Sequence, residues 1–335
     1  MLTVGEVIAL SKPKEIALLR QFLTRFANDD KEICDILAES HKKQSNNLSL
    51  EMIKSGHLSE FNIIYSIVRG LAQSVGVDTN ILSRLLSNCK ETEIITASNF
   101  GIVSFLTINK SVILNYYDQG ILDNAISLHL LSTISYAQDA VYRILVDSPN
   151  GEGTGTGFIC RDPRAQRNVS YLVTAKHNVD PAAVIIKEIS AVSWTLENAS
   201  DLTWCHHPDI DISISPILDF PISATRLPLF PICPVLTEVI TLGFPTIPNC
   251  KHSHLLAHKG EVNGNVTSYL QSGNFLLISN AVSPGSSGSP VLNKLGSVVA
   301  IVTNSFERKD DISRISVQAA LDSQHIIDLI SERFP

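Results

Sequence analysis

The feature that most constrains this chain is a change in its apolar pattern near Tyr136. Before that residue, apolar side chains recur every three or four positions, which is the period of an amphipathic helix. After it, short β-branched runs alternate with Gly, Pro, Asn and Asp, as in short strands joined by turns. One architecture does not satisfy both periods, so the sequence predicts two domains, residues 1–135 and 136–335.

The first domain is predicted to be a small helical bundle. Ser11 and Pro13 are start signals for a helix, and Asp30 and Ser59 are suitable caps for two more. The predicted apolar faces of these three helices contain Ile16, Leu19, Phe22, Leu23 and Phe26; Ile33, Ile36 and Leu37; and Phe61, Ile64, Val68 and Leu71. A further helix is expected around Leu82. Residues 92–135 show a less clear period, and a last helix is expected within them over residues 121–131.

The second domain is predicted to be an all-β barrel or sandwich that ends in a helix. The expected strands are residues 140–146, 157–160, 170–174, 183–186, 211–215, 239–242, 275–278 and 297–303. Many short strands with turn signals between them argue against an alternating βαβ protein. Residues 317–333 return to helical spacing and predict the closing helix.

The composition excludes several classes of protein. With 335 residues, 44% of them hydrophobic, the chain has enough apolar material for ordinary cores, which excludes disorder and fibrous repeats. The net charge is −7 and the 26 basic residues are scattered, so a nucleic-acid partner is not expected. The N-terminus lacks the pattern of a secretory signal, and no stretch approaches about 18 uninterrupted apolar residues. We therefore expect a cytoplasmic protein without a membrane partner, whose six cysteines are free thiols.

Three segments of the second domain contain residue types that act together in nucleophilic catalysis. One predicted strand runs into His177, another is opened by Asp211, and Ser287 lies in a Gly-Ser turn. A serine hydroxyl needs a neutral imidazole to take its proton, and a carboxylate orients that imidazole. Asp209 is an alternative carboxylate. Each segment alone is also what an ordinary strand end or turn would contain.

Together, the segments YLVTAKHNV, HPDIDISI and SPGSSGSP resemble the trypsin/chymotrypsin-like serine endopeptidases, in particular disulfide-free members of bacterial type. The resemblance covers residues 140–335 and includes residues 155–159, 241–245 and 298–302. It implies a chymotrypsin-like double β-barrel with a C-terminal helix. It also implies a catalytic triad of His177, Asp211 and Ser287, and the match to Asp-Ile-Ser-Ile favours Asp211 over Asp209.

The same resemblance implies further site residues. The backbone N–H groups of Gly285 and Ser287 would form the oxyanion hole, and the P1 substrate pocket would be lined by Ala281, Val282, Thr303 and Asn304. The pocket residues include no carboxylate, so we expect a small or medium uncharged P1 side chain.

Two departures from secreted members of the family concern activation and disulfide formation. Ser286 replaces an Asp that pairs with a new N-terminus after zymogen cleavage, and Asn178 replaces a disulfide-forming Cys. Activation by that ion pair is therefore not expected.

The sequence thus predicts an intracellular serine endopeptidase that acts on protein or peptide substrates through an acyl-enzyme and needs no cofactor. Residues 1–135 are expected to control it and to offer a site for a regulatory protein partner. The alternatives are a catalytically idle scaffold and, less favoured, a serine esterase, whose nucleophile turn has a different motif.

Two other motifs have simple explanations. The segment GEGTGTG, residues 151–157, lacks the Gly-Lys-Ser/Thr ending of a phosphate loop. Cys250, His252, His254 and His258 are spaced as zinc ligands, as are Cys205, His206 and His207, but solvated loop residues are the simpler interpretation and no metal is predicted.

Overall fold

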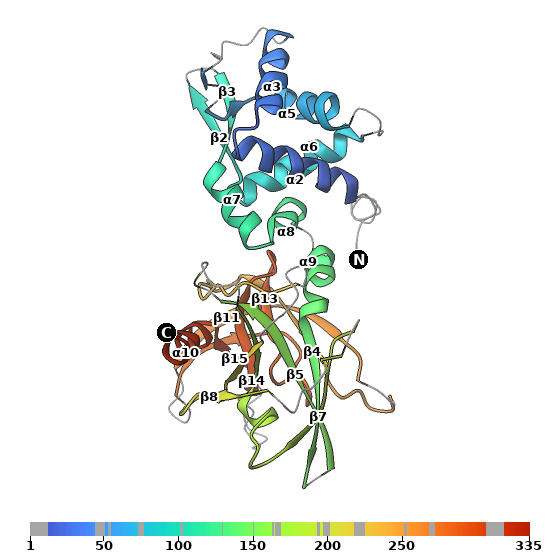
Figure 1. Cartoon of the computed structure of the whole chain (residues 1–335), viewed down its shortest axis with the longest axis vertical. Coiled ribbons are helices and arrows are strands. Elements are labelled where there is room, and N and C mark those ends of the chain that lie inside the picture. The colour runs from blue at the N-terminus through green and yellow to red at the C-terminus, as the bar shows by residue number, and fades with distance from the viewer. Residues whose placement is uncertain are drawn as a thin grey trace. The chain divides into compact units, whose positions relative to one another are not determined.

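The chain forms two compact units, Met1–Ser132 and Thr133–Pro335, shown in Figure 1. The computed structural model describes residues 13–43, 51–52, 55–72, 77–100, 103–128, 130–149, 151–162, 164, 169–192, 195–196, 202–217, 225–250, 253–267, 272–305 and 318–335. Each unit is described separately below.

The first unit combines helices with a small antiparallel sheet. Its elements are α2 (Pro13–Ala27), α3 (Lys31–Lys43), β1 (His57–Leu58), α5 (Glu60–Ser66), the π-helix η1 (Ile67–Leu71), α6 (Thr79–Glu91), β2 (Ile95–Phe100), β3 (Val103–Ile108), α7 (Lys110–Asp118) and α8 (Leu122–Ser127). The sheet has the strand order β1-β3-β2. The prediction of a purely helical bundle is therefore wrong over residues 95–108, where β2 and β3 form a hairpin with Ile95 opposite Ile108.

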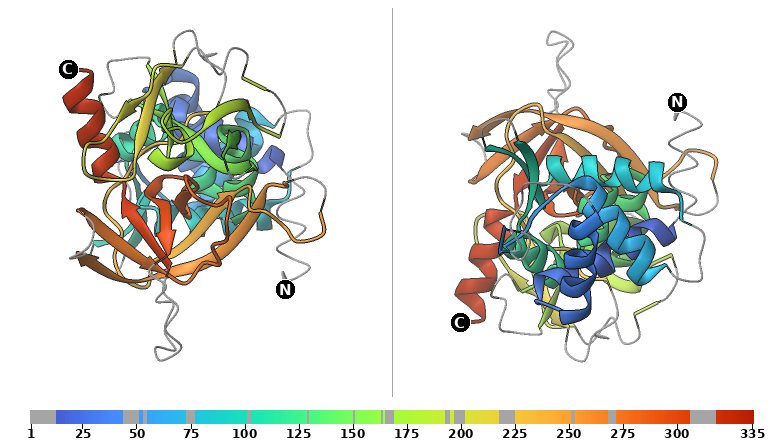
Figure 2. Two further views of the ribbon diagram at one scale, coloured as in Figure 1. Left: turned by 90° about the horizontal axis from the view of Figure 1, so that it is seen from below. Right: turned by 90° about the horizontal axis from the view of Figure 1, so that it is seen from above.

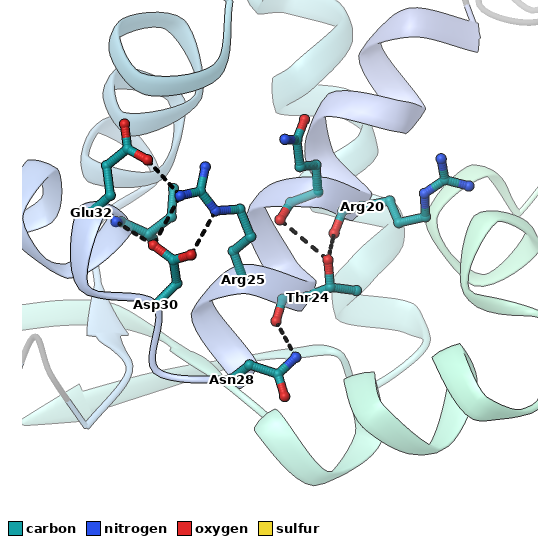
Figure 3. A network of polar contacts seen from close by, with 8 residues as sticks. Arg20, Thr24, Arg25, Asn28, Asp30 and Glu32 are labelled. Atoms are coloured by element: carbon teal, nitrogen blue, oxygen red, sulfur yellow. Dashed lines mark hydrogen bonds and ion pairs between the residues drawn. The ribbon is translucent and has the colours of Figure 1, made fainter.

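Helices α2 and α3 follow the sequence pattern. Leu19, Phe22, Leu23 and Phe26 of α2 are fully buried. Asp30 accepts a hydrogen bond from the Ile33 N–H, as a cap does. Asp30 also binds the guanidinium of Arg25, which reaches Glu32 as well, so the α2–α3 turn is closed by one cation and two carboxylates (Figure 3). These hydrogen bonds lower the pKa of Asp30.

The face of α5 differs from the one predicted. Ser59 and Asn62 form a capping box, and the Asn62 side chain is buried and donates to Ser40 Oγ at 3.0 Å. With Asn62 turned inward, Ile63 and Ile67 become the buried positions. Phe61 and Val68, which were predicted to be buried, are 45% and 41% exposed. The capping geometry sets the helix rotation here, and the apolar spacing alone does not reveal it.

The second unit contains a sheet and a closed barrel. It begins with the end of α9 (Leu130–Ala137) and η2 (Gln138–Ala140), and its strands are β4 (Val141–Ser148), β5 (Gly151–Arg161), β6 (Ser170–Thr174), β7 (Ile185–Ser190), β8 (Cys205–His206), β9 (Ser213–Ile217), β10 (Glu238–Gly243), β11 (Leu256–Thr267), β12 (Asn274–Ile278), β13 (Pro290–Asn293), β14 (Val298–Ser305) and β15 (Gln318–Asp322). Strands β4–β9 form a six-stranded sheet of order β7-β4-β5-β6-β9-β8, and β10–β15 close into a barrel. Of the two barrels predicted, only the second is closed by hydrogen bonds in the described part of the chain.

Each half of this unit has its own apolar core. Tyr142, Ile144, Ile159 and Leu172 belong to a cluster under the sheet. Val239, Val291, Val299 and others fill the barrel. Burial of these two cores is the main driving force that holds the strands in place.

The C-terminal helix is shorter than predicted. Residues 318–322 form β15, which pairs with both β12 and β14 and so completes the barrel. Helix α10 (Gln324–Arg333) begins only after it and lies at the outer edge of the strands in both views of Figure 2. The Phe334 ring, just beyond α10, packs against Tyr171 of β6 with 5.2 Å between ring centroids.

Two chain-wide properties complete the description. Within the described ranges, no helix is long and apolar enough to cross a membrane. All six cysteines are free thiols, and burial raises the pKa of Cys89 to about 12.

Candidate active site

Sheet pairing brings His177 and Asp211 together at one end of the neighbouring strands β6 and β9. Strand β6 runs antiparallel to β9 with Thr174 opposite Ser213. The turn η3 (Lys176–Asn178), which follows β6, therefore lies beside the residues that precede β9. The Asp211 carboxylate binds His177 twice: Oδ2 is 2.7 Å from Nδ1, and Oδ1 accepts the backbone N–H at 3.0 Å.

The contacts of Asp211 fix both its charge and the imidazole. Burial opposes ionisation of Asp211, but the hydrogen bonds and charge interaction with His177 outweigh it, so the pKa of the carboxyl is lowered. An ionised carboxylate only accepts, so Nδ1 carries a proton and Nε2 is left for another partner. The side chain of His177 is 47% exposed, against 23% for Asp211. Asp209, the alternative carboxylate, is exposed, and its backbone N–H donates to His207.

The loop that carries Ser287 depends on two glycines. Gly285 and Gly288 have φ of +94° and +90°, a region that other residues rarely adopt. A Cβ atom on Gly285 would lie 2.6 Å from the Phe244 carbonyl oxygen, and one on Gly288 would lie 1.8 Å from that of Thr156. The loop therefore approaches the neighbouring backbone more closely than any side chain permits.

The N–H groups of this loop fall into two sets. Those of Ser286, Gly288 and Ser289 donate to carbonyl oxygens of the protein. Those of Gly285 and Ser287 donate to none within the described part of the chain. Two unengaged N–H groups two residues apart, beside a serine hydroxyl, are the arrangement that stabilises a developing oxyanion.

The Ser287 hydroxyl has its own acceptor. It donates to the Thr303 carbonyl in β14 at 3.0 Å. Within the described residues it makes no hydrogen bond to His177. Thr303 lies where the β14–β15 register shifts between Val302 and Ser305. The structure thus joins His177 to Asp211, and the hydroxyl must turn from Thr303 before it can donate to the imidazole.

Sequence reasoning missed the role of Thr156, which anchors the serine loop to β5. Its N–H donates to the Ser287 carbonyl at 2.8 Å, and its hydroxyl donates to the Gly285 carbonyl at 2.8 Å. The same hydroxyl accepts the Phe244 N–H at 2.9 Å. The only signal in the sequence is a threonine between two glycines, just before the predicted strand 157–160, which does not reveal these distant partners.

Of the predicted P1 pocket residues, Ala281 and Val282 precede the serine loop in the chain, and Thr303 and Asn304 follow it in β14. Ala281 is exposed, Val282 is half-buried against the barrel core, and Thr303 is buried. The Asn304 side chain lies outside the described residues.

The two rival motifs have ordinary environments. Residues 151–157 lie inside β5 and pair with β4 along their length, so they form a strand instead of a phosphate loop. Cys250 and His254 are exposed, His258 is half-buried, and His252 lies outside the described residues. Across the part of the chain that the structure describes, no three His, Cys, Asp or Glu side chains gather as a metal site would require.

Comparison with known proteins places the site in a recognised domain. Residues 155–301 match the family profile of the trypsin-like peptidase domain, a segment that contains His177, Asp211 and Ser287. No curated protein sequence gives a significant match.

Similar solved structures include the HtrA-type protease AlgW with a tripeptide (15% identity, TM-score 0.47, 61% of this chain and 63% of that one). They also include the active form of the Rv3671c protease from M. tuberculosis (16%, 0.46, 59% and 82%) and a serine endoprotease from Yersinia pestis (17%, 0.44, 61% and 66%). The chain thus spans less than two thirds of the length of the HtrA-type protease that it matches.

The close approach of Gly288 to the Thr156 carbonyl predicts that adding one methyl group at Gly288 strongly destabilises the second unit. Gly288→Ala places a Cβ atom against the Thr156 carbonyl and should lower the free energy of unfolding of the second unit by about 3 kcal/mol or more. Gly151→Ala is the matched control, because its φ is +104° but nothing lies within 4 Å; about 1 to 2 kcal/mol is expected there. Urea denaturation followed by tryptophan fluorescence reports on this unit, and equal effects of the two changes would contradict the steric explanation.

Proposed function

We propose that this chain, in which residues 155–301 form a trypsin-like peptidase domain, is a serine endopeptidase with Ser287 as its nucleophile. His177 is the general base and Asp211 is the carboxylate that orients it. The observation that carries the proposal is the double contact of Asp211 with His177. The unengaged N–H groups of Gly285 and Ser287 support it.

The proposed reaction has two halves, acylation of Ser287 and hydrolysis of the acyl-enzyme, and His177 and the oxyanion donors act in both. The Ser287 oxygen attacks the scissile carbonyl carbon while its proton moves to His177 Nε2. The carbonyl oxygen becomes an oxyanion and accepts the N–H groups of Gly285 and Ser287. The tetrahedral intermediate then collapses, the C–N bond breaks, and His177 donates the proton to the leaving amine. Water repeats the sequence on the acyl-enzyme and releases Ser287.

Two other functions are weighed against this one. A catalytically idle scaffold has no physical need for an oriented imidazole or for free N–H donors, so the site disfavours it. A serine esterase uses the same chemistry on an ester bond, and only a comparison of amide and ester substrates distinguishes it.

The first unit is proposed to control the protease and to bind a regulatory protein partner. The proposal follows from Ser286, which leaves no Asp for activation by a newly cleaved N-terminus. With six free thiols, an intracellular location is proposed for the whole chain.

Labelling with a fluorophosphonate probe tests the nucleophile and its partners. Wild type should be labelled and Ser287→Ala should not, because the probe needs an activated serine oxygen. Asp211→Asn should lower kcat by roughly a thousandfold or more, since the amide no longer holds the required tautomer. Asp209→Asn is the matched control and should leave kcat within about twofold. A well-folded wild type that takes no label would favour the idle scaffold.

The P1 preference is tested with a peptide library. Ala281, Val282 and Thr303 offer no carboxylate to a cationic side chain, so cleavage should occur after small or medium uncharged residues. Mass spectrometry of the products identifies the cleaved bond. A preference for Arg or Lys would contradict the proposed pocket.

Control by the first unit is tested by comparing the full chain with residues 133–335. Removing the first unit should change kcat/KM on a protein substrate by about fivefold or more, the usual size of coupling between sites. Equal kcat/KM values together with an unchanged set of bound proteins would exclude control by this unit.

A further inference from the structure

The side chain of Asn178, the residue after His177, makes contacts that have no part in the proposed mechanism. Its side chain is buried, and Nδ2 donates to the Ser287 carbonyl at 2.8 Å and to Thr174 Oγ1 at 3.0 Å. A carbonyl oxygen only accepts, so the amide nitrogen must face Ser287. Both amide protons are therefore engaged, one of them by the backbone of the proposed nucleophile.

The peptide group that joins Ser287 to Gly288 is fixed at both ends. Its carbonyl accepts two donors, the Thr156 N–H and Asn178 Nδ2, each at 2.8 Å. Its N–H, from Gly288, donates to the Val302 carbonyl at 2.6 Å. Because a peptide group is planar, these three contacts fix its orientation and leave little freedom at the Ser287 backbone. The preceding peptide group, which carries the Ser287 N–H, is held through the Ser286 carbonyl, which accepts the Ser289 N–H at 2.9 Å.

Strand β5 leaves room for the Asn178 amide at Gly155. A Cβ atom on Gly155 would lie 2.4 Å from Asn178 Cγ, so only glycine fits beside this side chain. Thr174 Oγ1 accepts a hydrogen bond from the second amide N–H, and its hydroxyl donates to the Thr156 carbonyl at 2.6 Å. Asn178 and Thr156 therefore belong to one hydrogen-bond network, in which both N–H groups of the Asn178 amide are engaged.

The same short turn carries the proposed general base and the side chain that binds the Ser287 backbone. In η3, His177 is fixed by Asp211 and the adjacent Asn178 is fixed on the Ser287 carbonyl. We propose that Asn178 is a positioning residue that sets the Ser287 backbone, and with it the oxyanion donors, relative to His177. This inference rests on the proposed protease function. A buried amide that only stabilises the fold is the competing explanation.

The test replaces Asn178 with an apolar side chain of similar size. Asn178→Leu leaves the Ser287 carbonyl with one donor, so kcat should fall roughly tenfold to a hundredfold while KM changes by less than about threefold. Rates are counted per site labelled by the fluorophosphonate probe. Affinity for a peptide boronic acid, whose adduct with serine is tetrahedral, should fall in parallel with kcat.

The control carries the same substitution at another asparagine that binds backbone groups of the second unit. Asn293 accepts the N–H groups of Leu295 and Ser297 in the turn after β13, at the end of that strand away from Ser287. Asn293→Leu should lower the free energy of unfolding and leave kcat per labelled site within about twofold.

A second variant keeps the test decisive if Asn178→Leu does not fold. Asn178→Asp has the same shape, but its carboxylate has no proton to donate until it is protonated. Burial raises the pKa of such a carboxyl, so the kcat of the variant relative to wild type should rise as the pH is lowered toward about 5. A purely structural amide predicts a constant ratio.

The outcomes separate the two proposals. A wild type without label overturns the protease proposal itself. A labelled wild type, with variants whose kcat per site and boronic acid affinity stay within twofold, overturns only the role of Asn178. A loss of stability with unchanged kcat per labelled site does the same.

Discussion

The site depends on one buried threonine. Thr156 uses its N–H, its hydroxyl and its carbonyl, and their partners lie in the serine loop, in the segment after β10 and in β6. A buried polar group left without a partner costs about 1 to 3 kcal/mol, so four satisfied bonds at one residue strongly favour a single arrangement. The sheet and the barrel are thus tied together at the place where the chemistry is proposed.

The candidate residues could be predicted from local motifs that are ordinary one by one and indicate a protease only together. Strand β6 spans the predicted residues 170–174, and its end marks His177. Gly285 and Gly288 mark a turn that other residues cannot form. The roles of Thr156 and Asn178 could not be predicted in this way. Their partners lie far along the chain, and only the pairing of strands decides which of them meet.

The first unit shows the limits of periodicity more clearly. Residues 95–108 alternate weakly and in two short pieces, so neither period stands out, yet they form a hairpin. At Phe61 the helix is correct but its buried face is not, because Asn62 turns inward; Val68 lies in the π-helix η1, where the α-helical spacing no longer holds. The Asn62–Ser40 contact joins residues that are distant in sequence, so the apolar spacing does not reveal it.

The register shift in β14 has a consequence for the barrel as a whole. An uninterrupted ladder would engage every carbonyl of that strand in cross-strand bonds. Between Val302 and Ser305 the ladder is interrupted, and the Thr303 oxygen accepts a side-chain hydroxyl instead. A substrate backbone that reaches this oxygen would compete with Ser287 for it. Under the proposed function, a bound peptide that takes the Thr303 oxygen would therefore leave the Ser287 hydroxyl free to turn toward His177.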